Sequence, residues 1–216
     1  MMNQARGSKY SKPGMTLSTV VIGASGDLAK KKTYPALFEL YKSDLLPIDT
    51  RIWGIARSSL THEELRQKLR PFLKGEDVTI EEFLTLCFYQ QQSSYSDENA
   101  FSELVKEIEV FENGANFAKC NRLYYFAIPP NLFAETGLCI KNNGMAVKGW
   151  TRLIIEKPFG RDLKSCKQLL TTLSDNFLEE NLYRIDHYLG KVSLYLKICN
   201  IKKLHNFFCY LSKIRK

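Results

Sequence analysis

The sequence has neither a metal-binding cysteine pattern nor a long hydrophobic run. Its six cysteines are scattered, without a CxxC pair and without a histidine at zinc-binding spacing, which predicts a reduced protein that holds no metal. No stretch approaches the roughly 20 apolar residues that span a bilayer, and the polar N-terminus lacks the apolar core of a signal peptide. We therefore expect a cytoplasmic protein without a membrane partner.

Acidic residues are absent from the last part of the chain, 192–216. That segment carries six of the eight net positive charges, on Lys197, Lys202, Lys203, Lys213, Arg215 and Lys216. The rest of the chain is therefore almost balanced in charge, and a balanced surface does not require a polyanionic partner. We expect no nucleic-acid partner for the folded part. Contact of the basic tail with nucleic acid or an acidic membrane is the weaker alternative.

Three segments can be distinguished along the 216 residues, whose 44% hydrophobic and 25% charged content is typical of a globular protein. Residues 1–15 are polar and end at a Pro-Gly pair, which predicts a flexible arm. Residues 16–191 are expected to form one well-cored domain, followed by the basic tail.

Short apolar runs alternate with amphipathic stretches throughout that domain. Strands are expected at 17–22, 51–56, 88–91, 121–128 and 151–156. Helices are expected around Pro35, with an interruption or a restart at that residue, and at 61–73, 80–86, 97–111, 132–142 and 162–173. Thr61 and Asp97 are expected to cap two of these helices. Such alternation predicts an α/β fold with a doubly wound parallel sheet, which binds ligands beyond the carboxyl ends of its strands.

A glycine-rich turn follows the first expected strand. Its residues are Gly23, Ala24, Ser25, Gly26, Asp27, Leu28 and Ala29, followed by Lys30, in GxxGxxA spacing. Glycine permits the backbone angles of such a turn and the close approach of a pyrophosphate, and the helix N-terminus beyond it presents N–H groups to that anion. The motif predicts nucleotide binding in a Rossmann-like domain; the alternative is an ordinary strand-to-helix turn.

The end of the second expected strand indicates which dinucleotide binds. An acidic residue there would bind the ribose hydroxyls of NAD and repel a 2′-phosphate, but this strand ends in Arg57 and Ser58. The guanidinium of Arg57 offers a forked donor for a phosphate. We therefore favour NADP over NAD, against the alternative that Arg57 is an ordinary exposed arginine.

Two further segments carry groups suited to an anionic, hydroxyl-rich ligand. Lys157 follows a strand end in EKPFG and could reach into the cofactor crevice, although a solvated lysine in an exit loop is the alternative. The segment RIDHYLGK gathers two cations, a carboxylate, an imidazole and a phenol within about two helical turns, on Arg184, Asp186, His187, Tyr188 and Lys191. We expect this segment to bind phosphate and hydroxyl groups.

Taken in order, GASGDLAKKKTYPALFELY, GIARSSLT, YYFAIPP, EKPFGRDL and RIDHYLGK closely resemble the glucose-6-phosphate dehydrogenase family over residues 17–191. The resemblance implies transfer of a hydride from C1 of glucose 6-phosphate to NADP, at the entry to the oxidative pentose phosphate pathway. It implies that NADP contacts the residues from Gly23 to Lys30, Arg57, Tyr125 and Lys157. It also implies that the sugar phosphate is held by Lys157, Asp186, His187, Tyr188 and Lys191, and that Pro158 is cis.

The resemblance ends near Lys191, where the family continues into a large α+β domain with the catalytic His–Asp pair and the dimer surface. We expect that domain to be absent from this chain. The histidines are His62, His187 and His205, and none of them is a candidate general base. We therefore expect no catalytic residues, no family homo-oligomer surface and no activity of the chain as it stands; the alternative function is a truncated NADP-binding module without catalysis.

Overall fold

The computed structural model describes residues 14–114, 117–159 and 163–185. At its centre is a six-stranded sheet of order β3-β2-β1-β4-β5-β6, in which every neighbouring pair is parallel. The strands are β1 (Met15–Ile22), β2 (Asp49–Ala56), β3 (Cys87–Gln91), β4 (Lys119–Phe126), β5 (Thr151–Glu156) and β6 (Leu182–Ile185). The predicted parallel sheet is confirmed, and its strand order reverses between β1 and β4.

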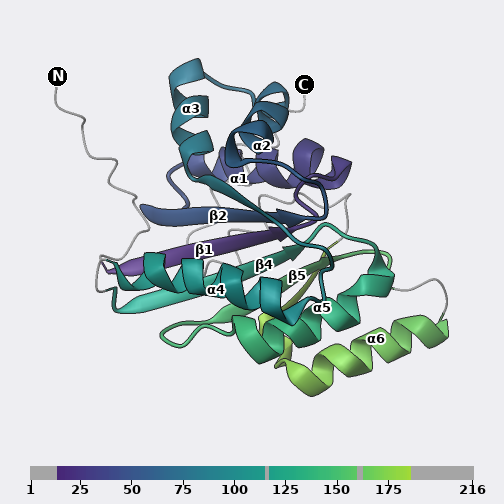
Figure 1. The fold of residues 1–216 in the computed structure, drawn as a ribbon. Coiled ribbons are helices and arrows are strands. Elements are labelled where there is room, and N and C mark those ends of the chain that lie inside the picture. The colour runs from purple at the N-terminus through teal and green to yellow at the C-terminus, as the bar shows by residue number, and fades with distance from the viewer. Residues whose placement is uncertain (1–13, 115–116, 160–162, 186–216) are drawn as a thin grey trace, which may run out of the picture.

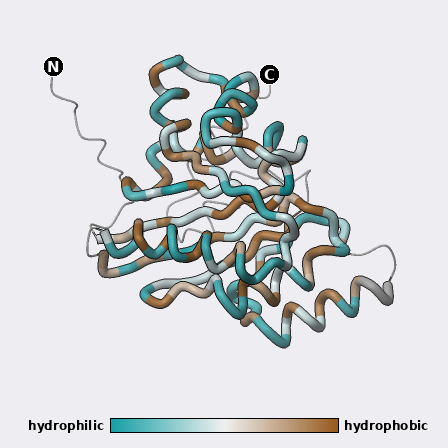
Figure 2. Tube along the Cα trace, in the orientation of Figure 1, coloured by the Kyte–Doolittle hydropathy of each residue, from teal (hydrophilic) through white to brown (hydrophobic). Residues whose placement is uncertain are grey.

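Three of the described α-helices cover each face of this sheet (Figure 1). One face carries α1 (Tyr34–Lys42), α2 (His62–Leu69) and α3 (Asp77–Thr85), and the other carries α4 (Glu98–Asn113), α5 (Phe133–Cys139) and α6 (Leu163–Asn176). The helices alternate between hydrophobic and hydrophilic residues along their length (Figure 2), as amphipathic helices do. The doubly wound arrangement therefore buries both faces of the sheet, and Val20, Val21 and Ile22 in β1 are fully buried.

The predicted interruption at Pro35 is confirmed. A π-helical turn, Ala29–Thr33, precedes α1, and the N–H of Tyr34 donates to the carbonyl of Ala29, five residues earlier. Pro35 has no N–H, and its ring would clash with the carbonyl four residues earlier in a regular α-helix, so a wider turn fits there. The other short helical segments of the described chain are Arg70–Phe72, Pro130–Leu132, Ile140–Gly144 and Glu179–Asn181.

Several element boundaries differ from expectation. β1 begins two residues before the expected start at 17, and α3 begins at Asp77 rather than at Ile80. The helix expected at 132–142 is divided into a 3₁₀ turn, α5 and a π turn. β6 was not predicted, because a strand of only four residues shows no recognisable period.

Asp97 caps α4, as the sequence predicted. One oxygen of its carboxylate, Oδ1, accepts hydrogen bonds from the N–H groups of Asn99 and Ala100, both at 3.1 Å. The bond from Ala100, a bond from the Ser93 hydroxyl and the bond from Asn99 hold the pKa of Asp97 below its usual value, although desolvation opposes them. The ionised carboxylate therefore stabilises the start of this helix.

Replacing Asp97 with alanine should lower the free energy of unfolding in a pH-dependent way. A carboxyl whose pKa is lower in the folded state stabilises the fold above its unfolded pKa, and this contribution is lost as the pH falls through the folded pKa. The difference between Asp97→Ala and the parent should therefore be complete above roughly pH 5 and shrink below roughly pH 4. Urea unfolding at several pH values measures it. Asp97→Asn should keep most of the stability at neutral pH, and a pH-independent deficit in Asp97→Ala would contradict this account.

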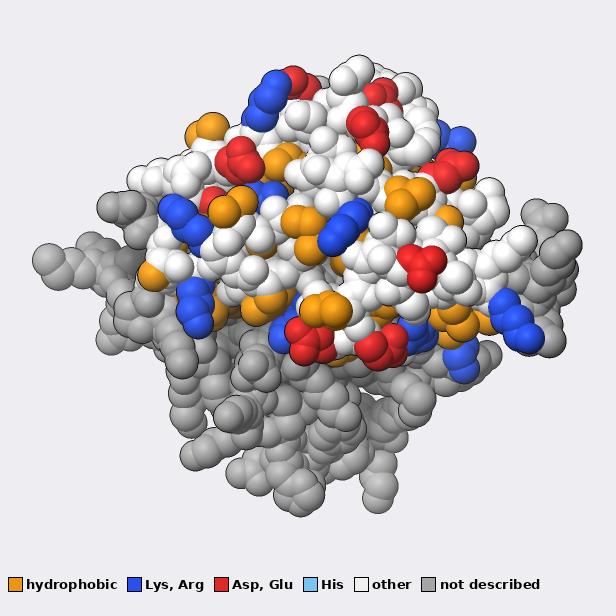
Figure 3. All heavy atoms as spheres, turned by 90° about the horizontal axis from the view of Figure 1, so that it is seen from below, with side chains coloured by type: hydrophobic (Ala, Val, Ile, Leu, Met, Phe, Trp, Pro, Cys, Tyr) orange, Lys and Arg blue, Asp and Glu red, His pale blue; other side chains and the backbone are white. Residues whose placement is uncertain are grey.

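Among the described residues on the face seen in Figure 3, charged side chains of both signs are interspersed. None of the described helices combines the length and hydropathy needed to cross a bilayer. The described residues also contain no group of three or more His, Cys, Asp or Glu that could hold a metal ion.

Candidate functional site

An open pocket of about 530 Å³ lies at the point where the strand order reverses. In a doubly wound sheet the loops that leave the two central strands diverge to opposite faces, which leaves a crevice at the carboxyl ends of the strands. The lining residues follow β1, β2, β3 and β4: Gly23, Ser25, Gly26, Arg57, Ser58, Tyr95, Ala127, Ile128 and Pro129. The fold therefore brings the predicted glycine turn and the predicted phosphate ligand Arg57 to one pocket.

Gly23 turns the chain out of β1. Its φ is +87°, in the left-handed region that favours glycine. Its N–H and that of Ala24 donate to the carbonyl of Ile55 at 2.8 and 3.0 Å, which ties the turn to β2. A Cβ atom on Gly23 would lie only 2.4 Å from the carbonyl oxygen of Ala127. Only glycine therefore allows the loops after β1 and β4 to approach this closely.

A helix N-terminus borders the pocket beyond Gly23. The N–H of Gly26 donates to the carbonyl of Gly23 at 2.9 Å, and the N–H of Lys30 donates to the carbonyl of Gly26 at 3.1 Å. The first N–H groups of a helix have no partner within the helix, and the helix dipole is positive at this end. This part of the pocket is therefore suited to the pyrophosphate of a dinucleotide.

Other residues of the glycine motif support the turn rather than line the pocket. The carboxylate of Asp27 lies 2.8 Å from Nζ of Lys31 and 3.2 Å from Nζ of Lys30. Hydrogen bonds from Lys31 and Lys30 hold the pKa of Asp27 below its usual value. Ala24 and Ala29 are fully buried and Leu28 is partly buried, so the alanines allow the helix to pack closely on the sheet.

Arg57 and Ser58 form the side of the pocket that follows β2, and both are exposed. The two hydroxyl oxygens of Ser58 and Ser25 lie 3.0 Å apart, so a hydrogen bond joins this loop to the glycine turn. The carbonyl of Arg57 accepts a hydrogen bond from Nε2 of Gln91 at 3.3 Å. Burial raises the pKa of Tyr95, and the charge and hydrogen bonds of Arg57 oppose that rise. Arg57 is thus held at the pocket by several neighbours.

Tyr125 and Lys157 lie at the same end of the sheet but outside the pocket lining given above. Tyr125 is fully buried, and its hydroxyl donates to the carboxylate of Glu156 at the end of β5. Lys157 is exposed, and its N–H donates to the carbonyl of Ile185 at 3.0 Å. The Lys157–Pro158 bond is cis, as the resemblance implied. The cofactor contacts of Tyr125 and Lys157 stay predictions.

The segment RIDHYLGK is only partly described. Asp186, His187, Tyr188 and Lys191 lie outside the described residues, so their role as substrate ligands stays a prediction. The spacing of this segment was expressed in helical turns, but Arg184 at its start lies in the strand β6. Both ends of its guanidinium pair with the carboxylate of Glu179, with Nη2 at 3.1 Å from Oε2. Arg184 therefore forms an ion pair from β6 with Glu179, which lies in the 3₁₀ turn before that strand.

Part of the pocket lining was not predicted from the sequence. Tyr95 lies in a loop after β3 that has no recognisable motif. The segment 127–129 was interpreted as the end of a strand and as part of the motif YYFAIPP, but not as pocket lining. The topology of the predicted sheet was the signal that could have indicated this part of the lining. Because the loops after both central strands flank the crevice of a doubly wound sheet, AIPP after the fourth strand could have been named as a candidate from the sequence.

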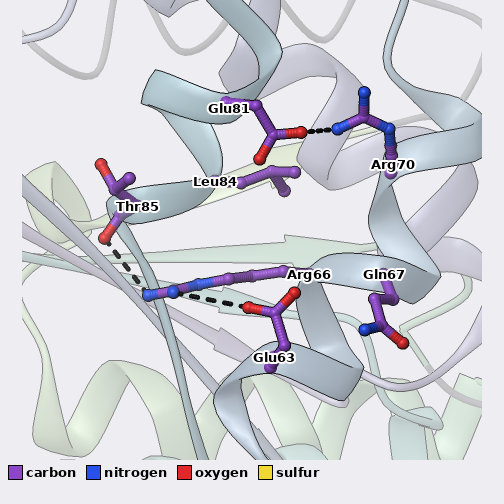
Figure 4. Close-up of a pocket in the computed structure, with 7 residues that line it drawn as sticks. All are labelled: Glu63, Arg66, Gln67, Arg70, Glu81, Leu84 and Thr85. Carbon is purple, nitrogen blue, oxygen red and sulfur yellow. Dashed lines mark hydrogen bonds and ion pairs between the residues drawn. The ribbon is translucent and has the colours of Figure 1, made fainter. Parts of the chain in front are cut away.

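A smaller pocket of about 90 Å³ lies between α2 and α3 and also contains arginines. Arg66 donates to the carbonyl of Thr85 at 3.4 Å and lies 3.8 Å from Glu63, and Arg70 pairs with Glu81 (Figure 4). These guanidinium groups are already neutralised by carboxylates. The pocket is also smaller than the roughly 300 Å³ at which ligand pockets begin, so it is no competitor for the dinucleotide.

Known sequences similar to this chain also indicate a nucleotide-binding domain. The family model described as "Glucose-6-phosphate dehydrogenase, NAD binding domain" matches residues 20–194. The glucose-6-phosphate 1-dehydrogenases of Dictyostelium discoideum and Saccharomyces cerevisiae are 45% and 46% identical over 180 and 177 residues. These matches cover 81% and 79% of this chain but 35% of each relative, so the chain spans about a third of their length.

Two solved structures share the fold. A glucose-6-phosphate dehydrogenase in complex with its substrate glucose-6-phosphate has a TM-score of 0.77 at 42% identity, over 84% of this chain and 38% of that chain. The glucose-6-phosphate 1-dehydrogenase of Mycobacterium avium has a TM-score of 0.67 at 29% identity, over 83% of this chain and 38% of that chain. Because the family model matches more than half of the chain, this protein belongs to the glucose-6-phosphate dehydrogenase family and carries its nicotinamide-nucleotide-binding domain.

Proposed function

We propose that this domain binds NADP and serves the NADP-dependent oxidation of glucose 6-phosphate to 6-phosphogluconolactone. The observation that carries the cofactor assignment is the pocket at the strand reversal, with a helix N-terminus on one side and Arg57 on the other. Its volume of about 530 Å³ lies within the range of ligand pockets. The family of the chain supports the reaction and its substrate.

The charge of the lining favours NADP over NAD. None of the described lining residues is acidic, so no carboxylate there repels a 2′-phosphate. Arg57 follows β2, where an enzyme that uses NAD would place an acidic residue, and a guanidinium can donate two parallel hydrogen bonds to a phosphate. Ser58 offers a further hydroxyl beside it.

The residues of this chain bind and orient the two ligands. Bound NADP supplies the hydride acceptor. Gly23 and Gly26 allow the pyrophosphate to approach the backbone, while Arg57 holds the 2′-phosphate. Lys157, at the carboxyl end of β5, lies at the edge of the sheet where ligands of this fold bind, which supports a place for it between cofactor and sugar phosphate.

Cofactor binding without turnover is the second candidate function. His62 is the one histidine of the described residues, and its Nδ1 accepts the N–H of Tyr89 at 3.0 Å. The described pocket lining contains no histidine and no carboxylate that could act as a general base. The appearance of NADPH at saturating glucose 6-phosphate tests this: turnover by the 216-residue chain would contradict the binding-module proposal.

Replacing Arg57 with alanine should weaken NADP binding about 10- to 100-fold, because hydrogen bonds between charged groups contribute about 1.5–3 kcal/mol. NAD binding should stay within about twofold, because NAD lacks the 2′-phosphate. Isothermal titration calorimetry with both dinucleotides measures the two affinities. Arg70→Ala is the matched control, since Arg70 pairs with Asp77 and Glu81 outside the cofactor pocket. Equal losses for NAD and NADP in Arg57→Ala would contradict the role in 2′-phosphate binding.

A further inference from the structure

The backbone on both sides of Arg57 is held by a tyrosine in the neighbouring strand. Tyr89 lies in β3 and is 5% exposed. Its hydroxyl donates to the carbonyl of Ser58 at 2.6 Å and lies 3.2 Å from the carbonyl of Ala56. Because Ala56 and Ser58 flank Arg57 in the chain, one phenol restrains the segment that presents this guanidinium.

The Tyr89 hydroxyl donates its proton to the carbonyl of Ser58 rather than to that of Ala56. A phenol has a single proton to donate, and the carbonyl of Ala56 also accepts the N–H of Gln92 at 2.9 Å. Burial raises the pKa of Tyr89 to about 12, so its hydroxyl stays protonated near neutral pH. The Tyr89 hydroxyl therefore keeps the proton that it donates to the carbonyl of Ser58 near neutral pH.

Ser58 is also joined to the glycine turn. Its hydroxyl oxygen lies 3.0 Å from that of Ser25, and Gln91 in β3 donates to the carbonyl of Arg57 at 3.3 Å. The hydrogen bonds of Tyr89, Ser58 and Ser25 therefore run from β3 to the turn that would bind the pyrophosphate. A dinucleotide presents its pyrophosphate and its 2′-phosphate at a limited range of separations, so the distance between this turn and Arg57 decides whether both can be bound at once.

We propose that Tyr89 is a positioning residue for recognition of the 2′-phosphate, which it serves by holding Ser58, and hence Arg57, at the distance from the glycine turn that NADP requires. The inference rests on the proposed function of the pocket. Tyr89 itself is outside the pocket lining, so it acts through Arg57 and touches no ligand. NAD makes no use of Arg57, and its binding should therefore be insensitive to Tyr89.

The test is Tyr89→Phe in the 216-residue protein, with calorimetric titrations of NADP and NAD and with urea unfolding. Loss of one hydrogen bond should weaken NADP binding about 3- to 10-fold and leave NAD binding within about twofold. Tyr34→Phe is the matched control, because Tyr34 is fully buried in the same part of the hydrophobic core as Tyr89, and its hydroxyl has no hydrogen-bond partner among the described residues. It should leave the ratio of NADP to NAD affinity unchanged.

A double-mutant cycle with Arg57→Ala sharpens the result. If Tyr89 acts through Arg57, Tyr89→Phe should cause no further loss of NADP affinity in the Arg57→Ala background. An unchanged ratio of NADP to NAD affinity in Tyr89→Phe, including equal weakening of both, would overturn the positioning role. If Arg57→Ala still lowers that ratio, the proposed function stays intact. A parent protein that binds neither dinucleotide would instead refute the proposed function.

A second variant keeps the proposal falsifiable if Tyr89→Phe does not fold. Gln91 is exposed at the end of β3, so Gln91→Leu removes the bond to the Arg57 carbonyl without changing the core. It should lower the ratio of NADP to NAD affinity in the same direction by about twofold to fivefold. An unchanged ratio in Gln91→Leu would show that restraint of this segment from β3 does not control selectivity.

Discussion

Gly23→Ala is expected to abolish measurable NADP binding and to lower the free energy of unfolding by about 2–4 kcal/mol. The φ of Gly23 is +87°, and an added Cβ would lie 2.4 Å from the carbonyl oxygen of Ala127 and 2.9 Å from Cγ2 of Ile128. Backbone atoms cannot rotate away from such a contact. The loops after β1 and β4 would have to separate, and the turn that would bind the pyrophosphate would be displaced.

Gly14→Ala separates the two causes of this effect. Gly14 has a similar φ of +79°, but the nearest atoms to its added Cβ belong to Ala118 at 3.9 Å. This variant therefore bears only the conformational cost of about 1 kcal/mol and should bind NADP like the parent. Urea unfolding and calorimetric titration measure both quantities. Gly23→Ala with a stability loss no larger than that of Gly14→Ala and with intact NADP binding would contradict the steric explanation.

Glu112→Ala is expected to cost about 3–5 kcal/mol of unfolding free energy, because it leaves a buried cation without its partner. Arg122 is 1% exposed, and its Nε and Nη2 donate to the two carboxylate oxygens of Glu112 at 2.9 and 2.7 Å. Burial would lower the pKa of Arg122, but the hydrogen bonds of Glu112 and the electrostatic contributions of Tyr124, Glu112 and Glu109 outweigh it and raise that pKa above its usual value. Glu109, at 3.7 Å from Arg122, is half-exposed and can compensate only in part.

This effect should be confined to stability. Arg122 lies in the first half of β4, whereas the cofactor pocket begins beyond the end of that strand, so any Glu112→Ala protein that stays folded should keep its NADP affinity. Chemical unfolding and NADP titration of the same preparation check both expectations. A loss of affinity without a loss of stability would contradict them.

Two controls test the cause of the stability loss. Glu103 pairs with Lys106 on the same helix, but both side chains are 64% exposed, so Glu103→Gln should change stability by less than about 0.5 kcal/mol. The double variant Glu112→Leu with Arg122→Met removes both charges and should recover most of the loss, because an apolar pair of similar volume needs no ionic partner. A Glu112→Ala protein as stable as Glu103→Gln would contradict the buried ion pair as a major contribution.

Much of the fold was predictable because its signals are local. The apolar run of β1 and the glycine turn behind it are contiguous in sequence, and they were located correctly. The capping box at Thr61 is confirmed: its Oγ1 accepts the N–H of Glu64 at 3.2 Å, while the Glu64 carboxylate accepts the N–H of Thr61 at 2.7 Å. Such caps join residues three positions apart, so the sequence shows both partners at once.

The pocket was predictable only in part, because its second half comes from residues without a motif. The sequence identified the glycine turn and Arg57, and the fold places both at one pocket. Tyr95 and Ala127 reach the same pocket only because β3 and β4 are placed beside β2 and β1. The engagement of Arg184 with Glu179 also depended on the unpredicted strand β6.

The sequence by itself determined the α/β class, the alternation of strands and helices, the helix caps and the resemblance to the family, since each of these is encoded in short-range periodicity or contiguous motifs. The tertiary structure alone decided the strand order, the side chains that line the pocket, the link from Tyr89 to Ser58 and the burial of the Arg122–Glu112 pair. The physical reason is that these features depend on hydrogen bonds and packing between strands and helices distant in sequence, whose relative placement local patterns do not specify.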